Sequence, residues 1–140
     1  MRRLTLLAVL AVGLAACGGS GAAKDTVKIT LGLSGGTMVP YSVTIAPGGA
    51  VTTTGNPPAK PKTLTSAQDA ELSRRVRSGF TNLKSEQCAG TFPDESAWFI
   101  TALGKTVIVR GTCEPGFWRR WFALTTPLGW PQLKATTVLR

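Results

Sequence analysis

The chain has 140 residues, with 16 Lys and Arg against 7 Asp and Glu, and it contains no histidine. The absence of histidine excludes the commonest general base and the commonest zinc ligand, and with them most Ser–His, Cys–His and His–metal sites. Hydrophobic residues make up 43% of the sequence, which is enough for one domain with a buried core. The formal charge of +9 would favour nucleic-acid binding, but the N-terminal segment changes that interpretation.

The N-terminal segment is typical of an export signal. Two arginines precede an apolar run over 4–14, whose 11 residues are too few to span a membrane. The run ends in Leu-Ala-Ala-Cys at 14–17, which resembles the lipobox of bacterial lipoproteins. That resemblance implies that residues 1–16 are a cleaved signal peptide and that the thiol of Cys17 is diacylated. An ordinary signal peptide with a chance cysteine is the alternative.

Export and lipidation change the meaning of the charge. Cleavage before Cys17 removes two arginines and leaves 14 basic and 7 acidic side chains, a net charge of +7. Residues 17–25 are expected to be a flexible tether, and acyl chains contribute roughly 0.8 kcal/mol per buried CH₂ to anchoring. We therefore expect a lipid anchor on the extracytoplasmic face of the cell membrane. The expected partners there are anionic lipid heads, wall polymers or an acidic protein, and no nucleic acid.

The two remaining cysteines, Cys88 and Cys113, lie in an oxidising compartment if the chain is exported. We predict a disulfide between them. The closed loop would be worth roughly 3.5 kcal/mol by chain entropy. Two free, buried thiols are the alternative.

Alternating apolar side chains predict an antiparallel sheet of about four to five strands. One segment is apolar on both faces, which indicates a central strand. Glycine-containing turns separate the strands within each hairpin. The proline-rich stretch 55–62 is expected to be an exposed connector of polyproline character. The expected strands are 26–33, 41–45, 50–54, 97–103 and 106–110.

Two helices are expected to pack on one face of that sheet. The first begins at a capping signature, either Thr65 with Gln68 or Ser66 with Asp69, and the second has Pro115 in its first turn. Each presents one apolar face at helical spacing. These faces are Leu72, Val76, Phe80 and Leu83 in the first helix, and Phe117, Trp121, Leu124 and Leu128 in the second. The elements predict one α+β domain over 26–128, followed by a C-terminal tail, 129–140.

Arginines accompany both apolar faces. Those at 74, 75 and 77 are interpreted as a solvated helix face rather than a binding site. The run Phe-Trp-Arg-Arg-Trp-Phe at 117–122 could bind single-stranded nucleic acid or dock at a membrane interface. We favour a core-packing helix whose arginines extend over its rim.

Catalytic patterns are missing from the sequence. Asp94 and Glu95 are the only adjacent acidic residues, and neighbours on an extended segment point to opposite faces. Asp94, which follows a proline, is better interpreted as a turn residue. There is no nucleophile elbow, phosphate-binding loop or metal-ligand spacing. We expect no enzymatic activity, no cofactor and no metal site.

The order of these signals resembles that of a known family. A strand ends in Ser34-Gly35-Gly36, a capped helix follows, and Pro93-Asp94 leads into an aromatic strand, a Gly-Lys hairpin and a final helix. Together they resemble the emfourin family, protein inhibitors of thermolysin-like metalloproteases, over about residues 26–128. The resemblance implies stoichiometric occlusion of a protease cleft by loops or termini, without a cofactor. The candidate binding residues are Ser34, Gly35, Gly36 and Asp94.

The sequence thus predicts a lipid-anchored, extracytoplasmic binding protein, with a protease-inhibitor-like module as its sharper form. The alternative is a structural or ligand-binding envelope lipoprotein that uses its basic surface against anionic lipids or wall polymers.

The lipid anchor is tested by Cys17→Ala. We expect this variant to lose lipidation and membrane retention, because the acyl chains supply the apolar area that holds the protein to the bilayer. Membrane fractionation of the variant and the unchanged protein measures this. An unchanged membrane fraction would contradict the anchor.

Overall fold

The structure is a computed structural model that describes residues 25–92 and 94–130. Cys17 and the segment 131–140 lie outside the described residues. In chain order the elements are β1 (Ile29–Ser34), β2 (Tyr41–Ile45), β3 (Val51–Gly55), α1 (Ser66–Arg77), a 3₁₀ turn (Phe80–Asn82), β4 (Glu86–Gln87), β5 (Ala97–Ala102), β6 (Lys105–Arg110) and α2 (Pro115–Thr125).

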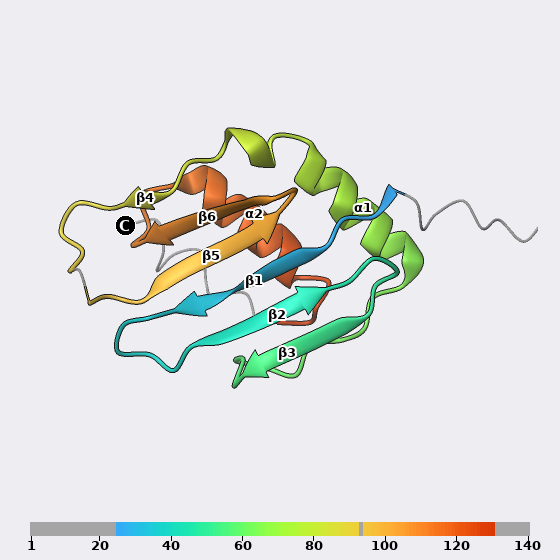
Figure 1. Cartoon of the computed structure of the whole chain (residues 1–140), viewed down its shortest axis with the longest axis horizontal. Coiled ribbons are helices and arrows are strands. Elements are labelled where there is room, and N and C mark those ends of the chain that lie inside the picture. The colour runs from blue at the N-terminus through green and yellow to red at the C-terminus, as the bar shows by residue number, and fades with distance from the viewer. Residues whose placement is uncertain (1–24, 93, 131–140) are drawn as a thin grey trace, which may run out of the picture.

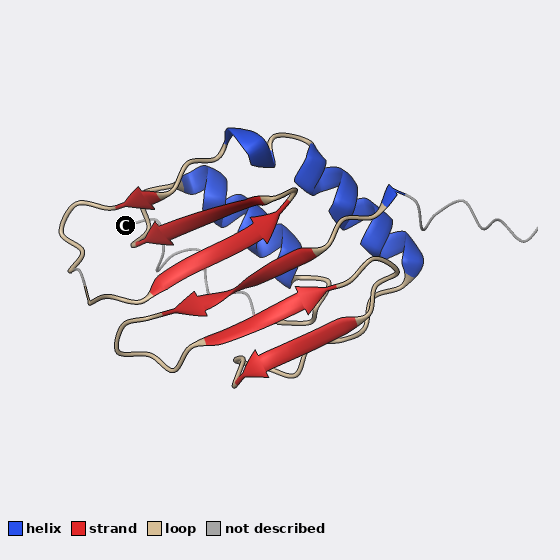
Figure 2. Ribbon diagram, in the orientation of Figure 1, coloured by secondary structure: helices blue, strands red, loops and turns tan. Residues whose placement is uncertain are grey.

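The described strands form a six-stranded sheet in the order β3-β2-β1-β5-β6-β4. Both helices lie behind this sheet in Figure 1, and Figure 2 shows the other face uncovered by helix. The predicted α+β class is therefore confirmed. The strand that periodicity did not predict is β4, a two-residue strand that pairs in parallel with β6. No helix of the described residues has the length and apolar character needed to cross a membrane.

The central contact of the sheet is the antiparallel pairing of β1 with β5. Its register runs from Ile29 opposite Ala102 to Ser34 opposite Ala97. β1 also pairs with β2, and β5 with β6, so each of the two central strands has a partner on both sides. The central position expected for the strand that is apolar on both faces is confirmed.

The two faces of the sheet differ sharply in chemistry. The covered face carries side chains that are at most 1% exposed, such as Leu31 and Ile100. The open face carries a row of threonines from five neighbouring strands, and their hydroxyls form hydrogen bonds of 3.0 Å within β1–β2 and 2.9 Å within β5–β6. β-branched, polar side chains suit a half-solvated strand surface. The row consists of Thr52, Thr44, Thr30, Thr101 and Thr106.

The first helix begins and ends at local signals. The Thr65 hydroxyl accepts from the Gln68 backbone N–H, and the Gln68 side chain accepts from the Thr65 backbone N–H, which confirms the first of the two capping alternatives. The helix ends at Arg77, earlier than the apolar spacing suggested, because Gly79 adopts a left-handed conformation with φ 96°. Phe80 lies beyond this break and is still fully buried in the core.

The segment after β3 is held against the residues that follow α2. Lys62 donates its backbone N–H to the Leu128 carbonyl at 3.0 Å, and the Trp130 indole donates to the Ala59 carbonyl at 3.1 Å. The connector 55–62 is therefore packed along part of its length rather than wholly exposed. Trp130 is only 6% exposed, so the core extends past the expected boundary at residue 128. Core residues run from Val27 to Trp130, and a chain that begins at Lys24 contains them all.

The predicted disulfide is confirmed. Cys88 and Cys113 are bonded, with their Cα atoms 5.6 Å apart. Cys88 also donates its backbone N–H to the Arg110 carbonyl at 3.0 Å. The bridge thereby ties the residue after β4 to the segment between β6 and α2.

Replacement of both cysteines by alanine tests what this bridge contributes. The sequence separation of 25 residues predicts a loss of about 3.5 kcal/mol in the free energy of unfolding, because the unfolded chain gains loop entropy. Denaturant unfolding of the double variant and of the oxidised protein measures the difference. Equal denaturant midpoints and equal slopes of the two unfolding curves would contradict this contribution.

Candidate functional site

An apolar groove, the aromatic groove, lies where β2, β5 and α2 meet the loop between β1 and β2. Its volume is about 750 Å³, which is within the range of ligand-binding pockets. None of the described residues that line it is charged. The lining consists of Thr37, Met38, Val39, Tyr41, Asn56, Pro58, Trp98, Trp121, Phe122, Thr125 and Trp130.

Aromatic side chains from separate elements form the wall of this groove. Trp98 of β5 and Trp121 of α2 pack edge to face with ring centroids 4.9 Å apart. Tyr41 packs edge to face on Trp130 at 5.7 Å, and Trp130 lies 6.5 Å from Trp121. Edge-to-face packing of this kind fixes ring orientations and adds about 0.5–1.5 kcal/mol per pair beyond area burial. The wall is therefore a rigid aromatic surface.

The loop between β1 and β2 forms the solvent-exposed side of the groove. The side chains of Met38 and Val39 are 49% and 71% exposed. The base of the loop is fixed, because Met38 donates its backbone N–H to the Ser96 hydroxyl at 3.3 Å. Gly36 has φ 73°, and a Cβ there would lie 2.3 Å from the Ser96 backbone nitrogen, so only glycine fits this approach.

The structure places the four candidate binding residues at this same end of the sheet. Ser34 donates its hydroxyl to the Ala97 carbonyl at 3.4 Å, and Gly35 and Gly36 form the turn that follows β1. Asp94 is exposed in the loop before β5, a loop that contacts the turn through Ser96. Ser34 and Gly36 thus position the loop, whereas its exposed apolar side chains, Met38 and Val39, lie outside the four candidate binding residues.

The side chain of Tyr41 places a buried hydroxyl in the groove wall. The residue is 6% exposed, and its hydroxyl has no hydrogen-bond partner among the described groups. Burial raises the pKa of Tyr41 to about 12. A buried hydroxyl without a partner costs about 1–3 kcal/mol, so this position retains a donor that an external acceptor could satisfy.

Acidic groups in the described residues do not converge on the groove. The buried carboxylate of Asp69 accepts the Gly48 backbone N–H at 2.7 Å and fixes the turn between β2 and β3 against α1. Within the ranges 25–92 and 94–130, no three His, Cys, Asp or Glu side chains are grouped so that they could hold a metal ion. The described lining of the groove is uncharged and largely apolar or aromatic.

Comparison of the chain with protein-family models, with curated proteins and with solved structures finds no match. The resemblance to emfourin stays a prediction, and function is inferred from the geometry of the site.

The titration of Tyr41 tests the burial of the groove wall. Tyr41 is the only tyrosine in the sequence, so the absorbance of tyrosinate follows this residue alone. We expect a midpoint near pH 12 in the folded protein and near pH 10 after unfolding. Because the folded pKa is raised, the associated stability is complete below pH 10 and is lost as pH rises toward 12.

The matched variant for this titration is Tyr41→Phe. Its free energy of unfolding is expected to fall less steeply between pH 10 and 12 than that of the unchanged protein. A folded-state midpoint near pH 10 would show that the hydroxyl is solvated.

Proposed function

We propose that the protein is a lipid-anchored, extracytoplasmic binding protein that holds an apolar segment of a partner protein. The segment would lie in the aromatic groove and against the loop that carries Met38 and Val39. The observation that carries this proposal is the rigid aromatic wall beside two exposed apolar side chains. Buried aromatic anchors dominate binding energy at protein interfaces, and rigid side chains lose little entropy on binding.

A protein segment fits the groove better than a charged small molecule. The lining residues are uncharged, which disfavours a ligand that must pair its charge. Exposed apolar side chains at the rim are typical of protein-binding surfaces. The unpartnered hydroxyl of Tyr41 would donate to a backbone carbonyl of the bound segment. The net charge of +7 on the exported chain favours partners with acidic flanks.

The resemblance to emfourin gives a more specific version of the proposal, in which the partner is a thermolysin-like protease. The loop between β1 and β2 is fixed at its base by Ser96, and fixed loops lose little entropy when they occlude a cleft. Inhibition would then need no chemistry from the chain itself.

Val39→Asp tests the surface, with Leu103→Asp as its matched control. Both residues are exposed apolar side chains, but Leu103 lies in the turn between β5 and β6, at the opposite end of the sheet. We expect Val39→Asp to weaken partner binding at least tenfold, because a carboxylate at an apolar contact loses its hydration. Leu103→Asp should bind as the unchanged protein does.

The measurement is capture of partners from the protein's own envelope by the lipidated chain and by each variant, followed by affinity measurement on the captured protein. Equal capture by the two variants would contradict the proposed surface. A second arm titrates the chain from Lys24 onward against several thermolysin-like proteases. Inhibition near a one-to-one ratio supports the inhibitor form, whereas no inhibition removes that form and leaves the binding proposal to the capture experiment.

A second candidate function is that of an envelope lipoprotein whose basic surface faces anionic lipids or wall polymers. The observation that favours it is the gathering of arginines on the two neighbouring helices. Arg74, Arg75 and Arg77 lie on α1, and Arg119 and Arg120 lie on α2. Clustered cations on one layer raise the local concentration of anionic partners.

A further inference from the structure

A second cavity, separate from the aromatic groove, lies between the two helices. Its volume is about 310 Å³. Val76 of α1 and Leu124 of α2, both at most 2% exposed, contribute apolar surface to it. Three arginines line it as well: Arg75 from α1, and Arg119 and Arg120 from α2. The cavity thus combines apolar surface with an excess of cations.

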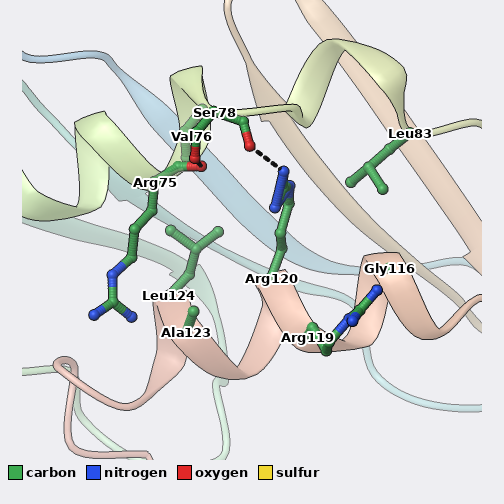
Figure 3. Close-up of a pocket in the computed structure, with 9 residues that line it drawn as sticks. All are labelled: Arg75, Val76, Ser78, Leu83, Gly116, Arg119, Arg120, Ala123 and Leu124. Carbon is green, nitrogen blue, oxygen red and sulfur yellow. Dashed lines mark hydrogen bonds between the residues drawn. The ribbon is translucent and has the colours of Figure 1, made fainter.

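Arg120 occupies the middle of this cavity. Figure 3 shows its side chain rising from α2 toward Ser78 at the end of α1, with Arg75 and Arg119 on either side. One terminal nitrogen of Arg120 donates to the Ser78 carbonyl at 2.5 Å. Its Nε is buried and has no hydrogen-bond partner among the described groups. Because a guanidinium has five donors and no acceptor, this Nε can be satisfied only by an acceptor brought in from outside the described groups.

Nearby carboxylates do not neutralise the cavity. Glu71 accepts from Arg75 at 2.7 Å and from Arg74 at 2.8 Å, and these hydrogen bonds lower the pKa of Glu71. Glu114 accepts the Gly116 backbone N–H at 2.9 Å and caps α2. Neither carboxylate forms an ion pair with Arg119 or Arg120 within the described part of the chain. Positive charge therefore remains in excess on the α2 side.

We infer that this cavity binds a phosphate group, carried either by an anionic lipid or by a free phosphate compound. The guanidinium fork matches phosphate oxygens in geometry and charge. A phosphate offers enough acceptor oxygens to accept hydrogen bonds from the guanidinium groups of Arg119 and Arg120 together. The apolar surface would accommodate a small organic part of the ligand.

Arg119→Gln tests the site, and Lys28→Gln is the control. Both changes remove one positive charge from an exposed side chain, but Lys28 does not line the cavity. The chain from Lys24 onward is titrated with inorganic phosphate, and with phosphatidylglycerol or phosphatidylcholine vesicles. We expect Arg119→Gln to weaken binding about tenfold, the usual effect of losing one charge-assisted hydrogen bond, and Lys28→Gln to change it less than twofold.

The two probes separate the sources of the phosphate. Binding of inorganic phosphate with this difference between the variants identifies a site for free phosphate compounds, and the same difference on phosphatidylglycerol vesicles alone identifies a lipid headgroup site. Equal weakening by both variants would show general charge attraction and overturn the inference, as would the absence of binding to either probe. Val39→Asp should leave phosphate binding unchanged, so failure of the groove proposal and failure of this one are distinguishable.

Discussion

β1 and β5 come from segments far apart in the chain, and their antiparallel pairing from Ile29–Ala102 to Ser34–Ala97 joins two hairpins into one sheet. The register of this contact decides which side chains face the helices. A slip of one residue would turn the apolar set of β1 to the open face and bring its threonine and glycine into the core. With the observed register, β1 and β5 present their buried side chains to the same side, and α1 and α2 can both pack there. The packing of α1 and α2 on the sheet, and with it the wall of the aromatic groove, depends on that register.

The same pairing assembles both candidate sites from different parts of the fold. At the end where Leu33 lies opposite Trp98, the sheet brings Trp98 beside α2, and the loop after β1 is fixed against the loop before β5. Packing of the two helices on the covered face brings the end of α1 close to Arg120 of α2. The aromatic groove is neutral and the helix cavity is positively charged. One small domain can therefore offer two separate binding chemistries without sharing a side chain between them.

Local patterns in the sequence predicted the local structure well. Period-two alternation located five of the strands, and the Thr65–Gln68 capping box located the start of α1, because neighbouring residues alone determine those features. The apolar spacing of the first helix continued to Leu83, but the left-handed conformation of Gly79 ended α1 at Arg77. β4 has only two residues and no periodicity, so its parallel pairing depends on β6 and could not be predicted. The aromatic groove was not predicted because its wall is built from separate segments of the chain, which contribute Tyr41, Trp98, Trp121 and Trp130. The cavity between the two helices was not predicted because the arginines of α1 and α2 were interpreted one helix at a time.

Amide hydrogen exchange of the folded protein tests most directly whether the β1–β5 pairing holds this architecture together. Elements that open only by global unfolding exchange last, whereas edge strands and loops open locally with smaller free energies. We expect amides of β1 and β5 to exchange slowest and at a common rate. Amides of the edge strand β3 should exchange faster, and amides of the loop between β1 and β2 should exchange fastest. Exchange of β1 amides as fast as those of β3, with slow exchange confined to the β5–β6 hairpin, would contradict the central role of this pairing.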